Sequence, residues 1–543
     1  MSVADTIVKN AKIYTVDALR PWASAFAIAE GRFVAIGSNE DVAPHIGQST
    51  KIVDAKGAVI LPGLIDGHAH AFEGARSDLF ELEISPSHDF DRIIAAVSDA
   101  VRHKRPGEWL IGGGWSAGKL LPQLAEESSL ERLDKASQGH PTVLYDLSHH
   151  TAFANSIAMK IAGINEDSAV AGGTIVRYAD GRPAGLFLET AYSLLEEASP
   201  TLSEDDRRLT ALHATKLFNK HGVVGFAQAL TSEVIMSTFK ALDEKNELNA
   251  WIATYISMDT ILTPARDGIG QPAVEKRAQY NSTHIAVDYV KFFMDGVPAS
   301  LTAAFSKPYG GMSELVSSMI QVEALAKQIE TLDAQGIHVK VHAIGDQAIR
   351  DTLDAIEIVR KNNGKDGPQH SIAHLSYIDC NDIPRLAALN VAADICPPLW
   401  FPNITLETNI RLLGEERGSN AWSIRDILTS GADVTVGTDW PAIAQSPNPW
   451  PGMAALITRQ DPSNNYPGTF RPEQALTIYE ALPLYTINVA RSLGFSDQTG
   501  SIEAGKCADF IILDRDIFEI EPSEIKDVSI QATYFAGKKV YQA

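Results

Sequence analysis

From about residue 203 onward, helix-like stretches alternate with short apolar runs, and this alternation constrains the fold more than any other feature of the chain. The helix-like stretches cover 204–220, 232–246, 321–335, 347–362, 382–389 and 422–430. The apolar runs cover 59–65, 223–229, 250–256, 289–294, 337–342, 371–374, 391–396 and 434–437. Strand–helix alternation implies parallel strands joined by right-handed crossovers. About eight strand candidates suit a closed ring, so the sequence predicts an α/β fold of the (β/α)₈ TIM-barrel type.

Both chain ends depart from this rhythm. Residues 1–60 contain several short apolar or β-branched runs separated by turns, and the C-terminal end contains two more, at 508–513 and 530–541. Neither end is long enough to bury a good core alone, whereas pairing the two ends would bury both faces. We expect a small composite β-sandwich domain of residues 1–60 and 490–543 beside a barrel domain of residues 61–489.

A segment from about 77 to 202 interrupts the alternation between the first and second strand candidates. It contains Gly112-Gly113-Gly114-Trp115, a strand-like run at 142–146 and a turn-rich stretch at 172–183. Insertions that follow a barrel strand lie over the active site. We therefore expect an inserted lid or accessory segment.

Charge and cysteine content limit the partners. The 543 residues include 68 acidic and 46 basic ones, a net charge of −22, which repels nucleic acid and anionic membranes but also serves ordinary solubility. Cys380, Cys396 and Cys507 form neither a disulfide framework nor a CxxC site, and Cys396 is interpreted as a core residue. No signal-like start or membrane-length apolar run is present. We expect a cytoplasmic protein with a small-molecule substrate and with no nucleic acid or membrane partner. A homodimer is expected only because symmetric dimers are the commonest oligomers.

The strongest chemical signal is Asp66-Gly67-His68-Ala69-His70, which follows an apolar run. Residues i and i+2 face the same side of a strand, so His68 and His70 would both point into the barrel mouth. Two imidazoles on one face suit a divalent metal, while the alternative is a pair of solvated histidines at a strand end.

Polar residues also stand at the ends of later strand candidates, namely Lys291, His342, His374 and Asp439. A single histidine in such a place is more often a hydrogen-bonded structural group. Together, however, these residues fall where parallel barrel strands converge, and imidazoles with a carboxylate are the ligands that Zn²⁺ takes. A lysine inside an apolar run is costly to bury unless it is paired or chemically altered.

The ordered set of motifs resembles the amidohydrolase superfamily, and more narrowly its YtcJ-like, or amidohydrolase 3, branch. The matching segments are 62–70, 113–115, 150–156, 185–189, 290–296, 341–346, His374, 437–441 and 500–510. The match runs over nearly the whole chain. The activity that the resemblance most readily implies is hydrolysis of an N-substituted amide or formamide.

The resemblance also implies a ligand set for one or two divalent metal ions, usually zinc. The implied ligands are His68, His70, Lys291, His342, His374 and Asp439. Lys291 would be N-carboxylated and bridge two metals; the alternative is an unmodified amine paired with an acid such as Asp295. Asp439, helped by His342 and His374, would act on the hydrolytic water. Ala373 replaces an acidic residue usual in relatives, which puts a carboxylate partner for His374 in doubt. Gly225 stands where relatives usually have Thr or Ser.

Candidate substrate contacts are chosen from polar and aromatic residues near the expected mouth, with plain packing as the alternative for each. They are Trp115, His150, Asn155, Phe293, Tyr309, Trp400, Trp440 and Arg459. Two other functions stay open. One is an ester, lactone, carbamate or cyclic-amide hydrolase with the same centre, and the other is a metal-binding barrel without turnover, against which the presence of Asp439 argues.

Overall fold

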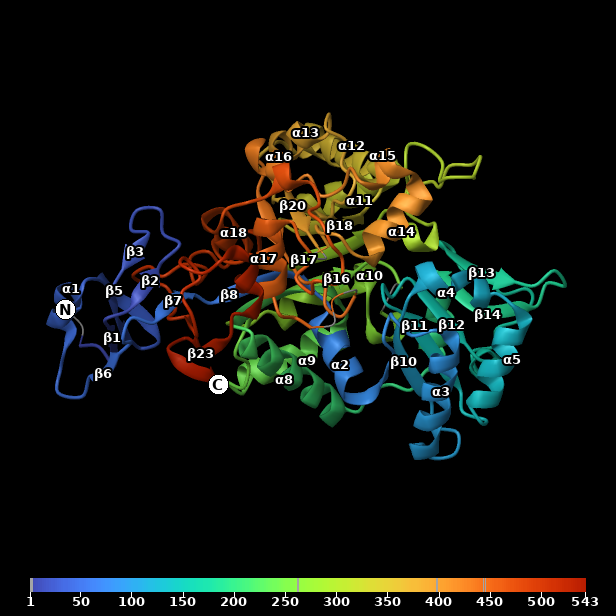
Figure 1. Cartoon of the computed structure of the whole chain (residues 1–543), viewed down its shortest axis with the longest axis horizontal. Helices are drawn as coiled ribbons and strands as arrows, with labels where there is room; N and C mark the ends of the chain where they lie inside the picture. The colour runs from blue at the N-terminus through green and yellow to red at the C-terminus, as the bar shows by residue number, and fades with distance from the viewer. Residues whose placement is uncertain (1–2, 261–262, 397–398, 443, 445) are drawn as a thin grey trace.

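A ring of eight parallel strands forms the centre of the computed structural model, which describes residues 3–260, 263–396, 399–442, 444 and 446–543 (Figure 1). The strands are β8 (Leu64–Ala69), β15 (Val223–Thr231), β16 (Trp251–Ser257), β17 (Ile285–Phe293), β18 (His338–Ala343), β19 (His370–His374), β20 (Val391–Ile395) and β21 (Val434–Val436). They pair in chain order from β8 to β21. Just beyond β21, the backbone N–H of Asp439 donates to the carbonyl of His68 at 2.7 Å, which ties the last strand to the first. The predicted TIM-type barrel is confirmed.

Helices cover the outside of this ring. The main ones are α8 (Glu204–Lys220), α9 (Glu233–Glu244), α11 (Val322–Asp333), α12 (Asp346–Asn363), α13 (Ile383–Ala388) and α16 (Ile424–Thr429). Ser203 and Ser232 cap α8 and α9 by accepting from the backbone N–H groups of Asp206 and Ile235. Every residue of β15 is buried, because the ring's interior covers one face of the strand and helices cover the other.

The two chain ends share one sheet. In this six-stranded sheet, β22 (Phe510–Leu513) pairs antiparallel with β7 (Val59–Pro62), placing Ile511 opposite Leu61. A four-stranded sheet of β5, β4, β1 and β6 lies beside it. Phe26 contacts Phe510 across the two sheets at a ring distance of 4.9 Å. The N-terminal and C-terminal strands therefore form the composite sandwich seen at one end of the molecule (Figure 1).

The other strands of these two sheets are short. The strands are β1 (Thr6–Lys9), β2 (Lys12–Tyr14), β3 (Trp22–Ala23), β4 (Ala25–Ala29), β5 (Arg32–Gly37), β6 (Lys51–Asp54), β23 (Ile530–Phe535) and β24 (Lys538–Gln542). Buried apolar residues of both sheets, among them Val8, Phe26, Ile60 and Phe510, form one cluster between the sheets, as a sandwich needs.

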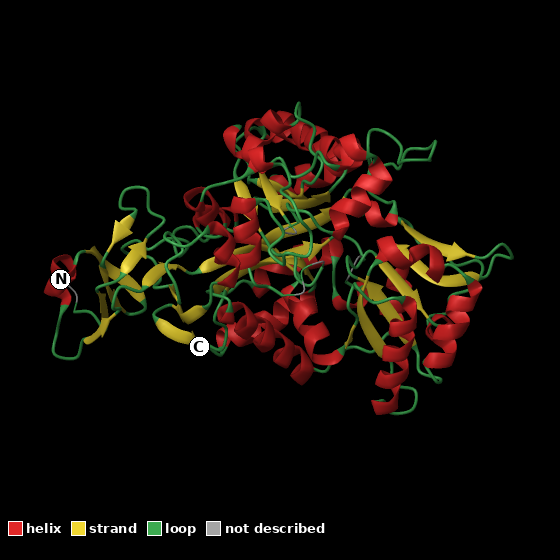
Figure 2. Cartoon of the chain, viewed as in Figure 1, coloured by secondary structure: helices red, strands yellow, loops and turns green. Residues whose placement is uncertain are grey.

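The inserted segment forms its own sheet, on the side of the barrel opposite the β-sandwich (Figure 2). Its strands are β9 (Leu82–Glu83), β10 (Leu110–Trp115), β11 (Thr142–Asp146), β12 (Thr151–Ala154), β13 (Gly173–Arg177) and β14 (Pro183–Glu189), covered by α3 (Phe90–Ala100), α4 (Ala117–Leu124) and α5 (Glu127–Ala136). Gly114 has a φ of +110°, and a Cβ there would overlap the carbonyl oxygen of Ile84. Close strand approach therefore explains part of the glycine run.

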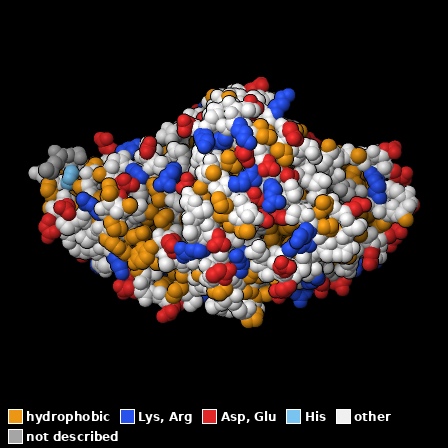
Figure 3. Space-filling view, turned by 90° about the horizontal axis from the view of Figure 1, so that it is seen from above, with side chains coloured by type: hydrophobic (Ala, Val, Ile, Leu, Met, Phe, Trp, Pro, Cys, Tyr) orange, Lys and Arg blue, Asp and Glu red, His pale blue; other side chains and the backbone are white. Residues whose placement is uncertain are grey.

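Positive and negative side chains are interspersed over the face drawn in Figure 3. None of the helices in the described part of the chain combines the length and apolarity that crossing a bilayer takes.

Candidate metal centre

His68, His70 and Asp439 meet at the barrel mouth. One carboxylate oxygen of Asp439, Oδ1, lies 3.3 Å from Nε2 of His70 and 3.5 Å from Nε2 of His68. All three side chains are buried, and the geometry leaves Oδ1 of Asp439 without a hydrogen-bond partner among the described residues. Their donor atoms lie within 4.8 Å of one another. Buried lone pairs facing a common point are the arrangement that a divalent cation satisfies, so these residues fit one.

Asp394 fixes the orientation of His68. Its Oδ2 accepts from Nδ1 of His68 at 2.8 Å and from Nζ of Lys340 at 2.6 Å, while Oδ1 accepts from Oγ1 of Thr435 at 3.1 Å. Because a carboxylate accepts, Nδ1 of His68 carries the proton and the lone pair of Nε2 faces the centre. Burial holds the pKa of His68 well below its ordinary value, which keeps the ring neutral. The sequence analysis missed Asp394 and Lys340, although each is a charged residue inside an apolar run.

His374 and Cys396 lie on the other side of His68. Nδ1 of His374 donates to the carbonyl of Cys396 at 2.7 Å, and the ring of His374 lies 5.2 Å from that of His68. The sulfur of Cys396 is 3.4 Å from the same nitrogen, and His68, His374 and Cys396 form a second group with donor atoms within 4.8 Å. Cys396 is buried, as expected of a core residue, but it borders the centre. Burial lowers the pKa of His374 to about 4.

His342 continues the row of imidazoles. Its ring lies 4.4 Å from that of His374 and stacks on Phe293 at 5.0 Å. Its Nε2 is 3.4 Å from the carbonyl of Gly296, and neither group of close donor atoms includes it. His342 therefore lies beside the centre, next to His374.

His150, which belongs to the inserted segment, lies at the end of this row of imidazole rings. Its ring lies 5.2 Å from that of His342, and its Nδ1 is 2.6 Å from Oε2 of Glu189. Burial by itself would lower the pKa of His150, but the Glu189 carboxylate raises it above the ordinary value. Glu189, a partner that the sequence analysis did not assign, also accepts from Thr302 at 2.6 Å. The insertion thus supplies a residue to the barrel's site.

Lys291 is buried with its amine 3.4 Å from Nε2 of His68 and 5.2 Å from the centre of the Phe293 ring. Burial and the charge of Lys340 lower its pKa to about 8. Among the described residues, Lys291 makes no ion pair with Asp295, the acid named as an example of a partner for an unmodified amine. Asp295 instead accepts from three backbone N–H groups, those of Ala304, Ile344 and Gly345, at 2.9–3.0 Å.

Three candidate substrate residues make structural contacts. The indole of Trp115 lies in the core of the inserted sheet and donates to the carbonyl of Leu144 at 2.9 Å. Asn155 caps the helix α6 (Ser156–Ile161). The hydroxyl of Tyr309 is buried and donates to the carbonyl of Ala303 at 2.9 Å. Packing and capping account for all three.

The other aromatic candidates and Arg459 are also buried. Trp400 donates to the carbonyl of Gly452 at 3.2 Å, and Arg459 donates to that of Phe470 at 3.0 Å. The indole of Trp440 covers Gly74, where any Cβ would clash, while its carbonyl accepts from the backbone of His70 at 2.8 Å. Among the eight candidates, His150 and Phe293 have ring contacts with His342.

The barrel, with its buried imidazoles and aspartate, places this protein in the class of metal-dependent hydrolases. Comparison with known proteins agrees. Residues 51–541 match the amidohydrolase family, and the chain belongs to that family. It is 27% identical to N-substituted formamide deformylase of Arthrobacter pascens, over 99% of this chain and 98% of the relative. It is 28% identical to protein LONG AFTER FAR-RED 3 of Arabidopsis thaliana, over 99% and 92%.

A solved structure shares the fold. An uncharacterized metal-dependent hydrolase from Pyrococcus horikoshii OT3 superposes with a TM-score of 0.73 at 21% identity, covering 95% of this chain and 99% of that one.

Proposed function

We propose that this hydrolase cleaves the C–N bond of an N-substituted amide or formamide with water. The observation that carries the proposal is the buried Oδ1 of Asp439, which faces His68 and His70 without a hydrogen-bond partner among the described residues. A carboxylate in this position can accept a proton from water and pass it to the leaving nitrogen. An amide needs that second transfer because an unprotonated amine anion is a poor leaving group. The similarity to a formamide deformylase supports this choice of bond.

His68, His70, His374 and Asp439 would hold the metal, and zinc suits a set of imidazoles with a carboxylate. When bound, a divalent cation lowers the pKa of water from about 15.7 towards 7 and polarises the substrate carbonyl. The protein's part is to keep the imidazoles neutral, which burial does at His68 and His374. It also holds His68 in one tautomer through Asp394.

Asp439 is the general base and then the general acid, work that contributes on the order of 10²–10⁴ in rate. His342 lies next to His374, and His150 lies next to His342. Their N–H groups would donate to the carbonyl oxygen as negative charge develops there. Phe293 stacks on His342 and fixes its ring.

Lys291 would carry a carbamate and join the ligand set. The neutral form of an amine is the one that adds carbon dioxide, and a pKa of about 8 makes that form available near neutral pH. A carbamate would turn a buried cation beside His68 into an anion, which suits a second metal.

The test is a substrate panel with zinc-loaded protein. N-benzylformamide and N-benzylacetamide are compared with the matching benzyl esters, and release of benzylamine or benzyl alcohol is measured. Turnover of the amides supports the proposal. Turnover of the esters or lactones alone would replace it with the ester-hydrolase alternative, and no turnover with full metal content would favour a binding protein.

A further inference from the structure

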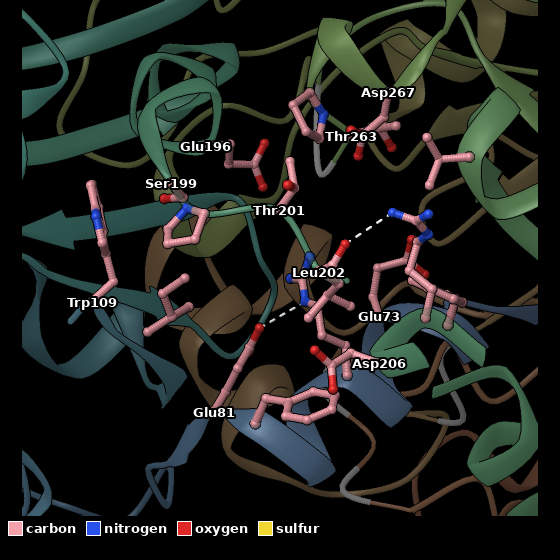
Figure 4. A pocket seen from close by; sticks show the side chains of 18 of the residues that line it. Glu73, Glu81, Trp109, Glu196, Ser199, Thr201, Leu202, Asp206, Thr263 and Asp267 are labelled. Carbon is pink, nitrogen blue, oxygen red and sulfur yellow. Dashed lines mark hydrogen bonds and ion pairs between the residues drawn. The ribbon is translucent and has the colours of Figure 1, made fainter. Parts of the chain in front are cut away.

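A cavity of about 460 Å³ lies beside the helix that follows His70 (Figure 4). One wall is α2 (Ala71–Phe80), which contributes Phe72, Glu73 and Arg76 and whose first residue directly follows His70. The inserted sheet contributes Tyr145, and Tyr145 stacks on His149 at 5.8 Å. Glu73, one helical turn from His70, is held by Gln228 of barrel strand β15 at 2.7 Å. The cavity therefore lies on the helix that begins directly after His70, and Gln228 of the barrel holds one residue of its wall.

Two buried polar atoms face this cavity without a partner. Oε2 of Glu196, on α7 (Ser193–Ala198), and Oγ1 of Thr263 line it, and neither has a hydrogen bond among the described residues. Both residues are more than nine-tenths buried. They lie along the same edge of the cavity, with Asp267, in Figure 4. Buried polar groups are nearly always hydrogen-bonded, so two orphans on one cavity indicate a ligand that supplies hydrogen-bond donors.

The charged groups of the cavity wall are mostly paired within the protein. Arg76 is bound to Glu81 at 2.8 Å, Arg207 donates to the carbonyl of Leu202 at 2.9 Å, and Arg266 donates to the carbonyl of Glu197. Lys104 and Arg105 both pair with Glu108 at 3.2 Å. Glu196 keeps an unpartnered oxygen, and its charged neighbours include Arg76, Arg266 and Asp267. Because the wall's cations are already bonded, this carboxyl oxygen is left for a donor that a ligand brings, and a cationic donor also compensates the charge of the ionised carboxyl.

Part of the wall is apolar. Phe72, Trp109, Ile111, Leu202 and Ile235 line the same space. We propose that this cavity binds a small primary ammonium ion with an apolar substituent, held through Glu196 and Thr263. That this ion is the amine released from the substrate rests on the proposed function, since hydrolysis of an N-substituted amide yields such an amine. The binding itself does not depend on turnover.

The protonation state of Glu196 provides a second, measurable consequence of ligand binding. Burial raises the pKa of Glu196 to about 8, with Arg76 and Arg266 opposing that rise and Asp267 and Glu197 adding to it. In the empty cavity the carboxyl therefore holds a proton at pH 7. A bound ammonium stabilises the carboxylate instead, so that proton is released to the buffer.

The experiment is calorimetric titration of the zinc-loaded protein with benzylamine at pH 7, in two buffers of different ionisation enthalpy. We expect saturable binding with proton release, and binding at least ten-fold weaker in Glu196→Gln. Benzyl alcohol and phenylacetate, which match the ring but lack the ammonium, should also bind at least ten-fold more weakly. Glu244→Gln, which alters an exposed acid of α9 outside the cavity, should bind as the wild type does.

Unchanged affinity in Glu196→Gln, equal affinity for benzyl alcohol or phenylacetate, or no binding of benzylamine would each overturn the proposal. A melting curve shows that Glu196→Gln is folded. The same titration in Asp439→Asn separates this proposal from the proposed function, because the cavity remains intact there whether or not Asp439 is the base. An inactive amide panel with intact, Glu196-dependent binding would remove the function and leave the cavity assignment standing.

Discussion

The carboxylate of Asp394 lies 2.8 Å from Nδ1 of His68, although 326 residues separate the two in the chain. Neighbouring strands do not explain the contact, since β20 and β8 are separated in the ring by β21. The pair instead reaches across the barrel interior, together with Lys340 from β18. His68, a proposed metal ligand, is thus oriented by a charge network inside the ring.

Replacing Asp394 tests this network. Asp394→Asn keeps the shape but loses the negative charge that both His68 and Lys340 use. Loss of such a partner weakens metal binding about 10–100-fold, so we expect zinc affinity to fall by that factor. Competition with a chromophoric chelator measures it. Asp497→Asn, an exposed change, is the control, and equal affinity in the two variants would contradict the role of Asp394.

Removing His68 should remove the metal. His68→Ala deletes a group that belongs to both clusters of close donor atoms found among the described residues, so neither cluster stays complete. We expect metal content by elemental analysis to drop sharply, while His103→Ala, at a residue outside these clusters, keeps full content. An unchanged metal-to-protein ratio in His68→Ala would show that the centre lies elsewhere.

Asp439→Asn should leave the fold and most of the metal in place but abolish proton transfer. The expected loss in kcat is on the order of 10²–10⁴, the usual contribution of a general acid–base group. Steady-state rates on the best amide of the panel measure it, with metal content determined on the same sample. A kcat close to that of the wild type would assign the proton transfers to another group.

Lys291→Ala tests the carbamate. If Lys291 is carboxylated, its loss removes an anion that a short carboxylic acid can replace, so acetate or propionate should restore part of the activity. Lys291→Arg keeps a cation and should not be rescued. Equal lack of rescue in both variants, together with density that ends at Nζ in a crystal structure, would show an unmodified lysine.

Glu196 should make stability depend on pH. Its pKa is raised from 4.5 to about 8 in the folded protein, so between these values the folded state holds a proton that the unfolded state has lost. The free energy of unfolding must then fall as pH rises, by up to about 1.4 kcal/mol per pH unit. Glu196→Gln removes this contribution. Urea denaturation from pH 5 to 8 should show a flatter profile for the variant, and parallel profiles would refute the shift.

The sequence by itself determined the barrel and much of the candidate centre. Alternating helical and apolar stretches predict parallel strands, and the spacing of His68 and His70 places both on one face. The positions of His374 and Asp439 at strand ends carry them to the same mouth. These signals are local, because each depends on residues within one strand and the turn that follows it.

Only the tertiary structure decided how distant groups pair. Asp394 and Lys340 look like misplaced charges in apolar runs until the ring brings them to His68. Trp115 and Asn155 carry family motifs, yet their hydrogen bonds serve packing and a helix cap. His150 reaches the centre because the inserted sheet rests on the barrel. Such contacts join residues of opposite charge or matching shape that lie far apart in the sequence. The spacing of residues along the chain therefore does not predict them.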